Sequence, residues 1–206
     1  MADRFTVALP DGWSAQLPAQ TLWTDADRMQ FVLGLAEWNI QNHCGGPFAA
    51  AVFERSSGDL VSIGVNQVVP QDCSLAHAEA MAVALAQQSE RTYDLSADKT
   101  RSFDLYTSGQ PCVQCFGMVW WSGITRLVVG ARATDIEELT DFQEGPLPED
   151  WKIQLQQRSP LPSVEVVCDV CRQEARDLLR RYQRECGPNY SPGCQPERRP
   201  GRETEH

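Results

Sequence analysis

Three residues of the sequence have the types and spacing of a zinc site. His77 precedes Cys112 and Cys115, which are three positions apart in the segment Pro111-Cys112-Val113-Gln114-Cys115. Zinc prefers imidazole nitrogen and thiolate sulfur, and a catalytic zinc site has three protein ligands and a water molecule in the fourth position. The spacing therefore predicts a Zn²⁺ ion bound by His77, Cys112 and Cys115.

A glutamate two positions after the histidine ligand extends this chemistry. Glu79 can reach a water at the metal without binding the metal, accept its proton and deliver that proton to a substrate nitrogen. His77-Ala78-Glu79 followed by Pro111-Cys112-Val113-Gln114-Cys115 is the H-x-E and P-C-x-x-C signature of zinc-dependent nucleobase deaminases. We therefore predict that Glu79 is the catalytic acid–base residue of a hydrolytic deamination.

Neither half of the signature is specific when it stands alone. A C-x-x-C pair alone favours structural zinc or redox chemistry, and an H-x-E segment alone favours an exposed helix. Their order, with a helix–strand–helix pattern around them, favours catalytic zinc. A closed structural site would need a fourth ligand, for which Cys44 and Cys73 are candidates, but such a site leaves Glu79 without a role.

Composition narrows the class of protein. The chain has 206 residues, of which 42% are hydrophobic and 22% charged, and this composition excludes collagen, coiled coil and general disorder. A net charge of −10 repels phosphate backbones, so no nucleic-acid partner is expected. We expect one zinc deaminase domain over residues 1–190 and a disordered tail over residues 191–206, where prolines recur.

The sequence has no recognisable signal peptide or membrane span, and we therefore expect a cytoplasmic protein. Residues 1–5 lack the apolar run of a signal peptide, and the apolar run 48–53 is too short to span a membrane, so no membrane partner is expected. In a cytoplasmic protein, C-x-x-C pairs indicate metal or redox chemistry rather than disulfides. The second pair, Cys168 and Cys171, has no histidine nearby, and we interpret it as coincidence or a weak adventitious metal site.

The helices and strands around these residues can be predicted from the spacing of apolar residues and from the glycines and prolines that interrupt it. Their alternation predicts helices on both faces of a partly parallel sheet. In the expected helix 113–121, Cys112 and Cys115 point to one side, and the positive helix N-terminus favours their thiolates. The expected elements are a helix from Thr24 or Asp25 to Ile40, strands 48–54 and 60–69, a helix 76–88, a strand 102–107, a helix 113–121, strands 127–130 and 164–167, and a helix 172–182, with an irregular stretch at 145–150.

From Met29 to Tyr190 the sequence resembles the cytidine deaminase-like superfamily, and specifically its guanine deaminase branch. This resemblance implies a three-layer α/β/α sandwich with a five-stranded mixed sheet, a homodimer, and conversion of guanine to xanthine and ammonia. Some members also take triazines such as ammeline. The resemblance is carried by Gly45–Val52, Asn66, His77–Glu79, Pro111–Gly117, Trp121 and Phe142–Gly145.

The resemblance also implies substrate-binding residues. The Asn66 amide can donate to and accept from a ring edge, although the residues alone favour a turn at the end of a strand. Glu144 could accept both N1–H and the 2-amino group of guanine, although without the family it is simply a solvated loop acid. In some relatives a tyrosine of the neighbouring subunit closes the pocket, and Tyr190 is its match here. The remaining expected contacts are Phe48, Ala78, Trp121 and Phe142.

Two departures from the family pattern keep alternatives open. Gln143 replaces the first of two acids that relatives carry after the phenylalanine, and Gln110 replaces a glutamate before the Pro-Cys pair. If the recognition acid aligned with position 143, the substrate would be another heterocycle or a nucleoside. A tRNA adenosine deaminase shares the same zinc set but is opposed by the acidic charge. A third interpretation is an inactive, zinc-stabilised interaction protein.

Overall fold

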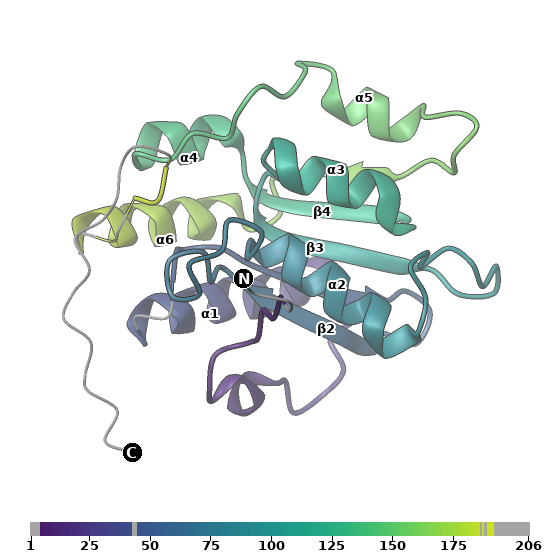
Figure 1. Cartoon of the computed structure of the whole chain (residues 1–206), viewed down its shortest axis with the longest axis horizontal. Coiled ribbons are helices and arrows are strands. Elements are labelled where there is room, and N and C mark those ends of the chain that lie inside the picture. The colour runs from purple at the N-terminus through teal and green to yellow at the C-terminus, as the bar shows by residue number, and fades with distance from the viewer. Residues whose placement is uncertain (1–4, 43–44, 186, 188, 192–206) are drawn as a thin grey trace.

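The computed structural model of the protein describes residues 5–42, 45–185, 187 and 189–191. Its centre is a five-stranded sheet with the strand order β2-β1-β3-β4-β5 (Figure 1). Strand β1 is antiparallel to β2 and β3, whereas β3, β4 and β5 are parallel to one another. The predicted mixed sheet is confirmed. The strands are β1 (Ala49–Glu54), β2 (Leu60–Val65), β3 (Phe103–Gly109), β4 (Arg126–Ala131) and β5 (Glu165–Val167).

Helices cover both faces of this sheet, as Figure 1 shows. Helices α1 (Asp25–Gln41) and α6 (Arg172–Arg184) pack on one face, and α2 (Ala78–Glu90) and α3 (Val113–Ser122) pack on the other. Two shorter helices lie at the periphery, with α4 (Ala133–Leu139) against α6 and α5 (Trp151–Gln156) against β5. The predicted α/β/α sandwich is therefore confirmed.

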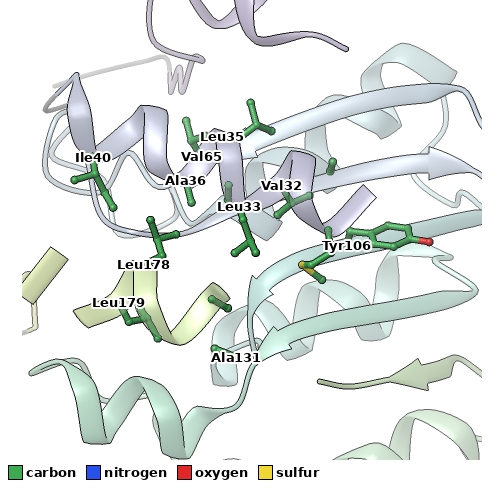
Figure 2. Close-up of a cluster of buried hydrophobic side chains, with 14 of the residues drawn as sticks. Val32, Leu33, Leu35, Ala36, Ile40, Val65, Tyr106, Ala131, Leu178 and Leu179 are labelled. Carbon is green, nitrogen blue, oxygen red and sulfur yellow. The ribbon is translucent and has the colours of Figure 1, made fainter. Parts of the chain in front are cut away.

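The sheet separates two hydrophobic cores because successive strand residues point to opposite faces. Ala51 and Phe53 of β1 belong to the core beneath α1 and α6, whereas Ala50 and Val52 belong to the core beneath α2 and α3. Figure 2 shows the first core, where residues of α1 meet Leu178 and Leu179 of α6. Burial on both faces makes β1 a continuous apolar run, which is why the sequence identified it.

Strand β2 ends earlier than its sequence suggests. The apolar residues Val68 and Val69 predicted a strand to position 69, but β2 ends at Val65. The side-chain oxygen of Asn66 accepts a hydrogen bond from the backbone nitrogen of Val68 at 3.3 Å. An asparagine that bonds the backbone two residues later forms a turn, and this turn stops the strand.

Three short elements were not predicted at all. They are a 3₁₀ helix at Trp13–Gln16, helix α4 and helix α5. Helices of six or seven residues contain less than two full turns, so their hydrophobic periodicity is too short to recognise. The irregular stretch 145–150 is confirmed.

A close backbone contact fixes the start of α2 over the sheet. A Cβ atom at Gly64 of β2 would lie 2.0 Å from the carbonyl oxygen of Ala78, so only glycine allows this approach. Because α2 begins directly after His77, the contact also places that histidine. Both α2 and α3 begin at the end of the sheet where β3 terminates, which is where ligands bind in open α/β sheets.

The described residues contain no helix long and apolar enough to cross a bilayer. Of the expected tail, Ser191 lies within the described part, and residues 192–206 lie outside it.

Candidate active site

The three predicted zinc ligands lie together at the starts of two helices. His77 is the N-cap of α2, Cys112 is the N-cap of α3, and Cys115 lies in the first turn of α3. The Nδ1 atom of His77 is 3.5 Å from the Sγ atom of each cysteine. Zn–N bonds of about 2.0–2.1 Å and Zn–S bonds of about 2.3 Å in a tetrahedron separate N from S by about 3.6 Å. The three residues therefore fit one zinc ion.

No other described histidine, cysteine or acidic residue joins this cluster. Cys73, one candidate for a fourth ligand, is described and does not belong to the group, while Cys44 lies outside the described residues. A three-residue ligand set leaves a coordination position for water, as in catalytic zinc sites. Within the described part of the chain, the ligand geometry thus favours a catalytic over a closed structural site.

The protonation of the two thiols suits metal binding. A hydrogen bond from Cys115 lowers the pKa of Cys112 to about 4; burial opposes this shift and a hydrogen bond with His77 adds to it. Cys112 is consequently a thiolate at neutral pH. The same bond and burial raise the pKa of Cys115, so zinc has to displace the proton of that thiol, and metal affinity increases with pH.

Glu79 is buried beside the metal ligands, in the first turn of α2. Its Oε2 atom accepts a hydrogen bond from the Cys115 thiol at 3.3 Å, and its Oε1 atom is 3.1 Å from the Thr107 hydroxyl. Burial raises the pKa of Glu79. A carboxyl group whose pKa moves toward neutrality is suited to both accept and donate a proton.

A cavity of 420 Å³ opens directly beside this cluster. Its volume falls within the range of small-molecule sites. A larger cavity of 660 Å³ lies between the N-terminal segment and β2, but none of its lining residues is a histidine or a cysteine. The residues around the smaller cavity include Phe48, Asn66, His77, Glu79, Cys112, Phe142, Glu144 and Tyr190.

Tyr190 reaches the cavity from within the same polypeptide. Its hydroxyl accepts a hydrogen bond from Nδ2 of Asn66 at 2.7 Å, and its ring lies 4.7 Å from the ring of Phe142. Asn189 beside it donates to the backbone oxygen of Asp141 at 2.9 Å. The C-terminal segment therefore need not come from a neighbouring subunit to close the pocket.

Glu144 is a buried cavity residue, not the solvated loop acid of the alternative interpretation. It is only 9% exposed, and its backbone oxygen accepts from the nitrogen of Val113 at 3.2 Å, which ties the Glu144 loop to the first turn of α3. Burial raises the pKa of Glu144 to about 9, and the negative charges of Cys112, Glu79 and Glu137 contribute. The carboxyl is therefore protonated at neutral pH.

Two predicted substrate contacts are not brought to the cavity. Trp121 lies at the far end of α3 with 72% of its surface exposed, and it is absent from the cavity lining. It follows Cys112 by nine residues, which is about 13 Å along a helix, so the expected substrate contact of Trp121 is corrected. Ala78 is fully buried against β2 and does not line the cavity.

The two departures from the family pattern both border the cavity. The side-chain oxygen of Gln110 accepts from the backbone nitrogen of Ala133 at 3.2 Å, which anchors the start of α4. Gln143 is exposed, and its amide donates to the backbone oxygen of Phe142 at 3.2 Å. Gln110 therefore positions a loop, and neither glutamine belongs to the metal cluster.

Thr107 was not predicted from the sequence. Its hydroxyl contacts Glu79, and the residue is 1% exposed in the central strand β3. The available signal was a hydroxyl residue near the carboxyl end of a strand that is buried along its whole length. The second C-x-x-C pair does not form a metal-binding cluster with other described residues. Cys168 packs on the core beneath α2 and α3, and Cys171 packs on the core on the opposite face of the sheet.

Comparison with known proteins also indicates a zinc-dependent deaminase. Residues 24–131 match the model of the cytidine and deoxycytidylate deaminase zinc-binding region. The solved structure of a guanine deaminase from Nitrosomonas europaea is 44% identical, with a TM-score of 0.82 over 89% of this chain and 98% of that one. A structure of the protein NE0047 in complex with 2,6-diaminopurine is also 44% identical, with a TM-score of 0.83 over 94% of this chain and 100% of that one.

Curated relatives match over a shorter region. A probable cytosine deaminase of Schizosaccharomyces pombe and a guanine deaminase of Bacillus subtilis are each 32% identical over 94 residues, or 46% of this chain. These matches cover 52% and 56% of the two relatives, so the chain spans about half of their length. The family model alone covers more than half of the chain and includes all three metal ligands and Glu79. The chain belongs to the family of the cytidine and deoxycytidylate deaminase zinc-binding region.

Proposed function

We propose that this protein catalyses the zinc-dependent hydrolytic deamination of guanine to xanthine and ammonia. The observation that carries the proposal is a single cavity lined by Glu144, Asn66, Glu79 and the zinc ligands His77 and Cys112. The similarity to a guanine deaminase along nearly its whole length supports this substrate.

The chemistry requires an activated water and a proton carrier. Zinc held by His77, Cys112 and Cys115 would supply a Lewis acid that lowers the pKa of water. Glu79 accepts the proton of the attacking water through one carboxylate oxygen and passes it to the departing amine nitrogen. Thr107 holds the other oxygen of Glu79 in place. Thr107 thus keeps the Glu79 carboxylate aligned through both proton transfers.

Guanine is recognised by polar side chains at its edges and by aromatic rings at its faces. The Glu144 carboxylate accepts N1–H and the 2-amino group, which adenine and cytosine do not present side by side. Asn66 contacts a second edge of the ring, and the rings of Phe48, Phe142 and Tyr190 enclose its faces. Triazines with an adjacent ring N–H and amino group, such as ammeline, present the same edge to Glu144.

Three other functions are less well supported. The match to a probable cytosine deaminase keeps other heterocycles and nucleosides open. A tRNA-specific adenosine deaminase is also among the relatives, but a net charge of −10 opposes tRNA binding. An inactive interaction protein would not need a buried glutamate beside the three residues that could hold the metal.

We further propose that the protein is a cytoplasmic homodimer. Helix α3 is apolar around most of its circumference, and Trp121 near its C-terminal end is 72% exposed, while Val113 beside the cavity is 46% exposed. Leu75 is 54% exposed, and it follows Ser74, whose backbone oxygen accepts a hydrogen bond from Gln114 of α3 at 3.1 Å. A helix that is hydrophobic on all sides is normally covered on all sides, so we infer that a second copy of this protein covers this surface.

The test is ammonia release by zinc-loaded protein from guanine, ammeline, adenine, cytosine, cytidine, guanosine and tRNA. Strong preference for guanine or ammeline supports the proposed recognition by Glu144. Activity on another compound alone would keep the Glu79 mechanism and refute the substrate. No activity on any of them would favour the interaction protein.

A further inference from the structure

A fully buried asparagine on α1 lies behind the substrate cavity. Asn39 is 0% exposed, and its helical neighbours Ala36 and Ile40 belong to the hydrophobic core. An amide buried among apolar residues destabilises the fold unless its donors and acceptor are all bonded. The partners of these bonds therefore show what the residue is for.

The Asn39 side chain forms hydrogen bonds with two loops, one that contains Gly46 and one that contains Asn66. Its Nδ2 atom donates to the backbone oxygens of Gly46 at 2.8 Å and of Asn66 at 3.0 Å. Its Oδ1 atom accepts from Nε2 of Gln67 at 3.1 Å, and that nitrogen also donates to the backbone oxygen of Asn66 at 3.2 Å. Asn39 thus joins the Gly46 loop to the Asn66 loop.

The two loops are packed too closely to move independently. A Cβ atom at Gly45 would lie 1.8 Å from the backbone oxygen of Asn66, and one at Gly46 would lie 2.9 Å from the ring of Tyr190. The glycines therefore allow the approach, and Asn39 supplies the bonds that maintain it.

The joined loops fix the orientation of the Asn66 amide. Its Oδ1 atom is near two backbone N–H groups, that of Gly46 at 3.4 Å and that of Val68 at 3.3 Å. Two N–H donors can face only the oxygen of an amide, so they determine which way the amide is turned. Nδ2 then faces the cavity, where it donates to Tyr190. Asn66 can donate to a ligand and has no oxygen left to accept.

We propose that Asn39 is a positioning residue that locks Asn66 as a hydrogen-bond donor toward the substrate. The pocket then selects heterocycles that present a lone pair at that edge, either a ring nitrogen or a carbonyl oxygen, and rejects those that present N–H there. This inference rests on the proposed function only in taking the cavity as the substrate site.

A double-mutant cycle between Asn39 and Asn66 tests the lock. Asn39→Ala should lower kcat/KM for guanine by about 10-fold to 100-fold, mainly through KM, a coupling typical of residues in one hydrogen-bonded network. In an Asn66→Ala background the same change should cost less than about 3-fold, because the group that Asn39 orients is gone. Equal losses in both backgrounds, or no loss in either, would overturn the proposal.

A matched control separates positioning from lost stability. Ser62 of β2 is partly buried, and its hydroxyl donates to the backbone oxygen of Ala82 at 2.6 Å without lining the cavity beside the metal ligands. Ser62→Ala should lower the melting temperature and leave KM unchanged. If Asn39→Ala does not fold, Gln67→Met removes the bond to Oδ1 of Asn39, and a smaller loss that disappears in Asn66→Ala supports the lock. A loss that persists there refutes it.

Binding of guanine to the zinc-loaded wild-type protein, measured by calorimetry with the heat of turnover subtracted, separates failure of the proposed function from failure of the positioning role. If the wild type neither binds nor deaminates guanine, the proposed function fails. If the wild type does both and Asn39→Ala binds guanine with unchanged affinity, only the positioning role fails.

Discussion

The hydroxyl of Thr107 lies 3.1 Å from Oε1 of Glu79 and 2.9 Å from the backbone oxygen of Gly109. A hydroxyl has one proton and two lone pairs, so it can donate to the Gly109 oxygen while it accepts from a protonated Glu79, or donate to an ionised Glu79. Thr107 can therefore hold the Glu79 carboxyl in both protonation states that a proton carrier passes through.

Thr107→Val should lower kcat for guanine by about 10-fold to 100-fold with little change in KM, because a hydrogen bond to a charged group contributes about 1.5–3 kcal/mol. Thr107→Ser keeps the hydroxyl and should recover most of the rate. Steady-state kinetics with zinc content measured per protein molecule checks this. A valine variant with wild-type kcat would show that Thr107 does not align Glu79.

Substrate affinity should depend on pH through Glu144. Its pKa of about 9 means that the folded protein keeps this carboxyl protonated at neutral pH. Accepting two N–H groups requires the carboxylate, so guanine binding releases a proton, and affinity should rise by up to about tenfold per pH unit between roughly pH 6 and 8.5.

This dependence is measurable without turnover. Guanine binding to zinc-loaded Glu79→Gln, measured by isothermal titration calorimetry, should strengthen with pH, and adding Glu144→Gln should weaken binding and remove the slope. A flat profile in the protein that retains Glu144 would mean that Glu144 does not bind the substrate as a carboxylate.

Zinc removal should abolish activity and destabilise the fold. A ligand present at about 100 times its Kd stabilises the native state by about 2.7 kcal/mol, which corresponds to a melting temperature about 5–10 °C higher in a protein of this size. Chelation should reverse this shift, and added zinc should restore it. Cys112→Ser should lose the zinc response, whereas Cys168→Ser, in the other C-x-x-C pair, should retain it. Equal responses of the two variants would refute the ligand assignment.

The sequence was most informative where chemistry restricts residue types. Zinc accepts few ligands, so His77, Cys112 and Cys115 could be predicted by type and spacing, and the structure brings them together. The long helices could be predicted because burial of one face imposes a period on the sequence, and β1 because burial on both faces makes it a continuous apolar run.

The remaining features depend on contacts between distant segments. Thr107 acquires its role because β3 carries it against Glu79 of α2, and Asn39 because α1 carries it behind the Asn66 loop. Local patterns do not encode such pairs. Trp121 was misplaced for a related reason: position along α3, not residue type, decides whether a residue reaches the cavity.

The exposed side of α3 should determine the oligomeric state. Trp121→Glu places a charge on the surface that we assign to the dimer, and it should shift the mass measured by sedimentation or light scattering to that of the monomer, 23.0 kDa. Tyr93→Glu is the matched control, because Tyr93 is 86% exposed and lies in a loop after α2. A wild-type protein that sediments as a monomer would contradict the homodimer.

The central claim is that Glu79 carries the proton in a zinc-dependent deamination of guanine. The most direct test is ammonia release from guanine by zinc-loaded wild-type and Glu79→Gln proteins measured side by side, with zinc content confirmed in both. We predict equal zinc content and a rate lower by about 10²–10⁴ in the variant, the usual contribution of a general acid–base group. Equal turnover by the two proteins would contradict this role of Glu79.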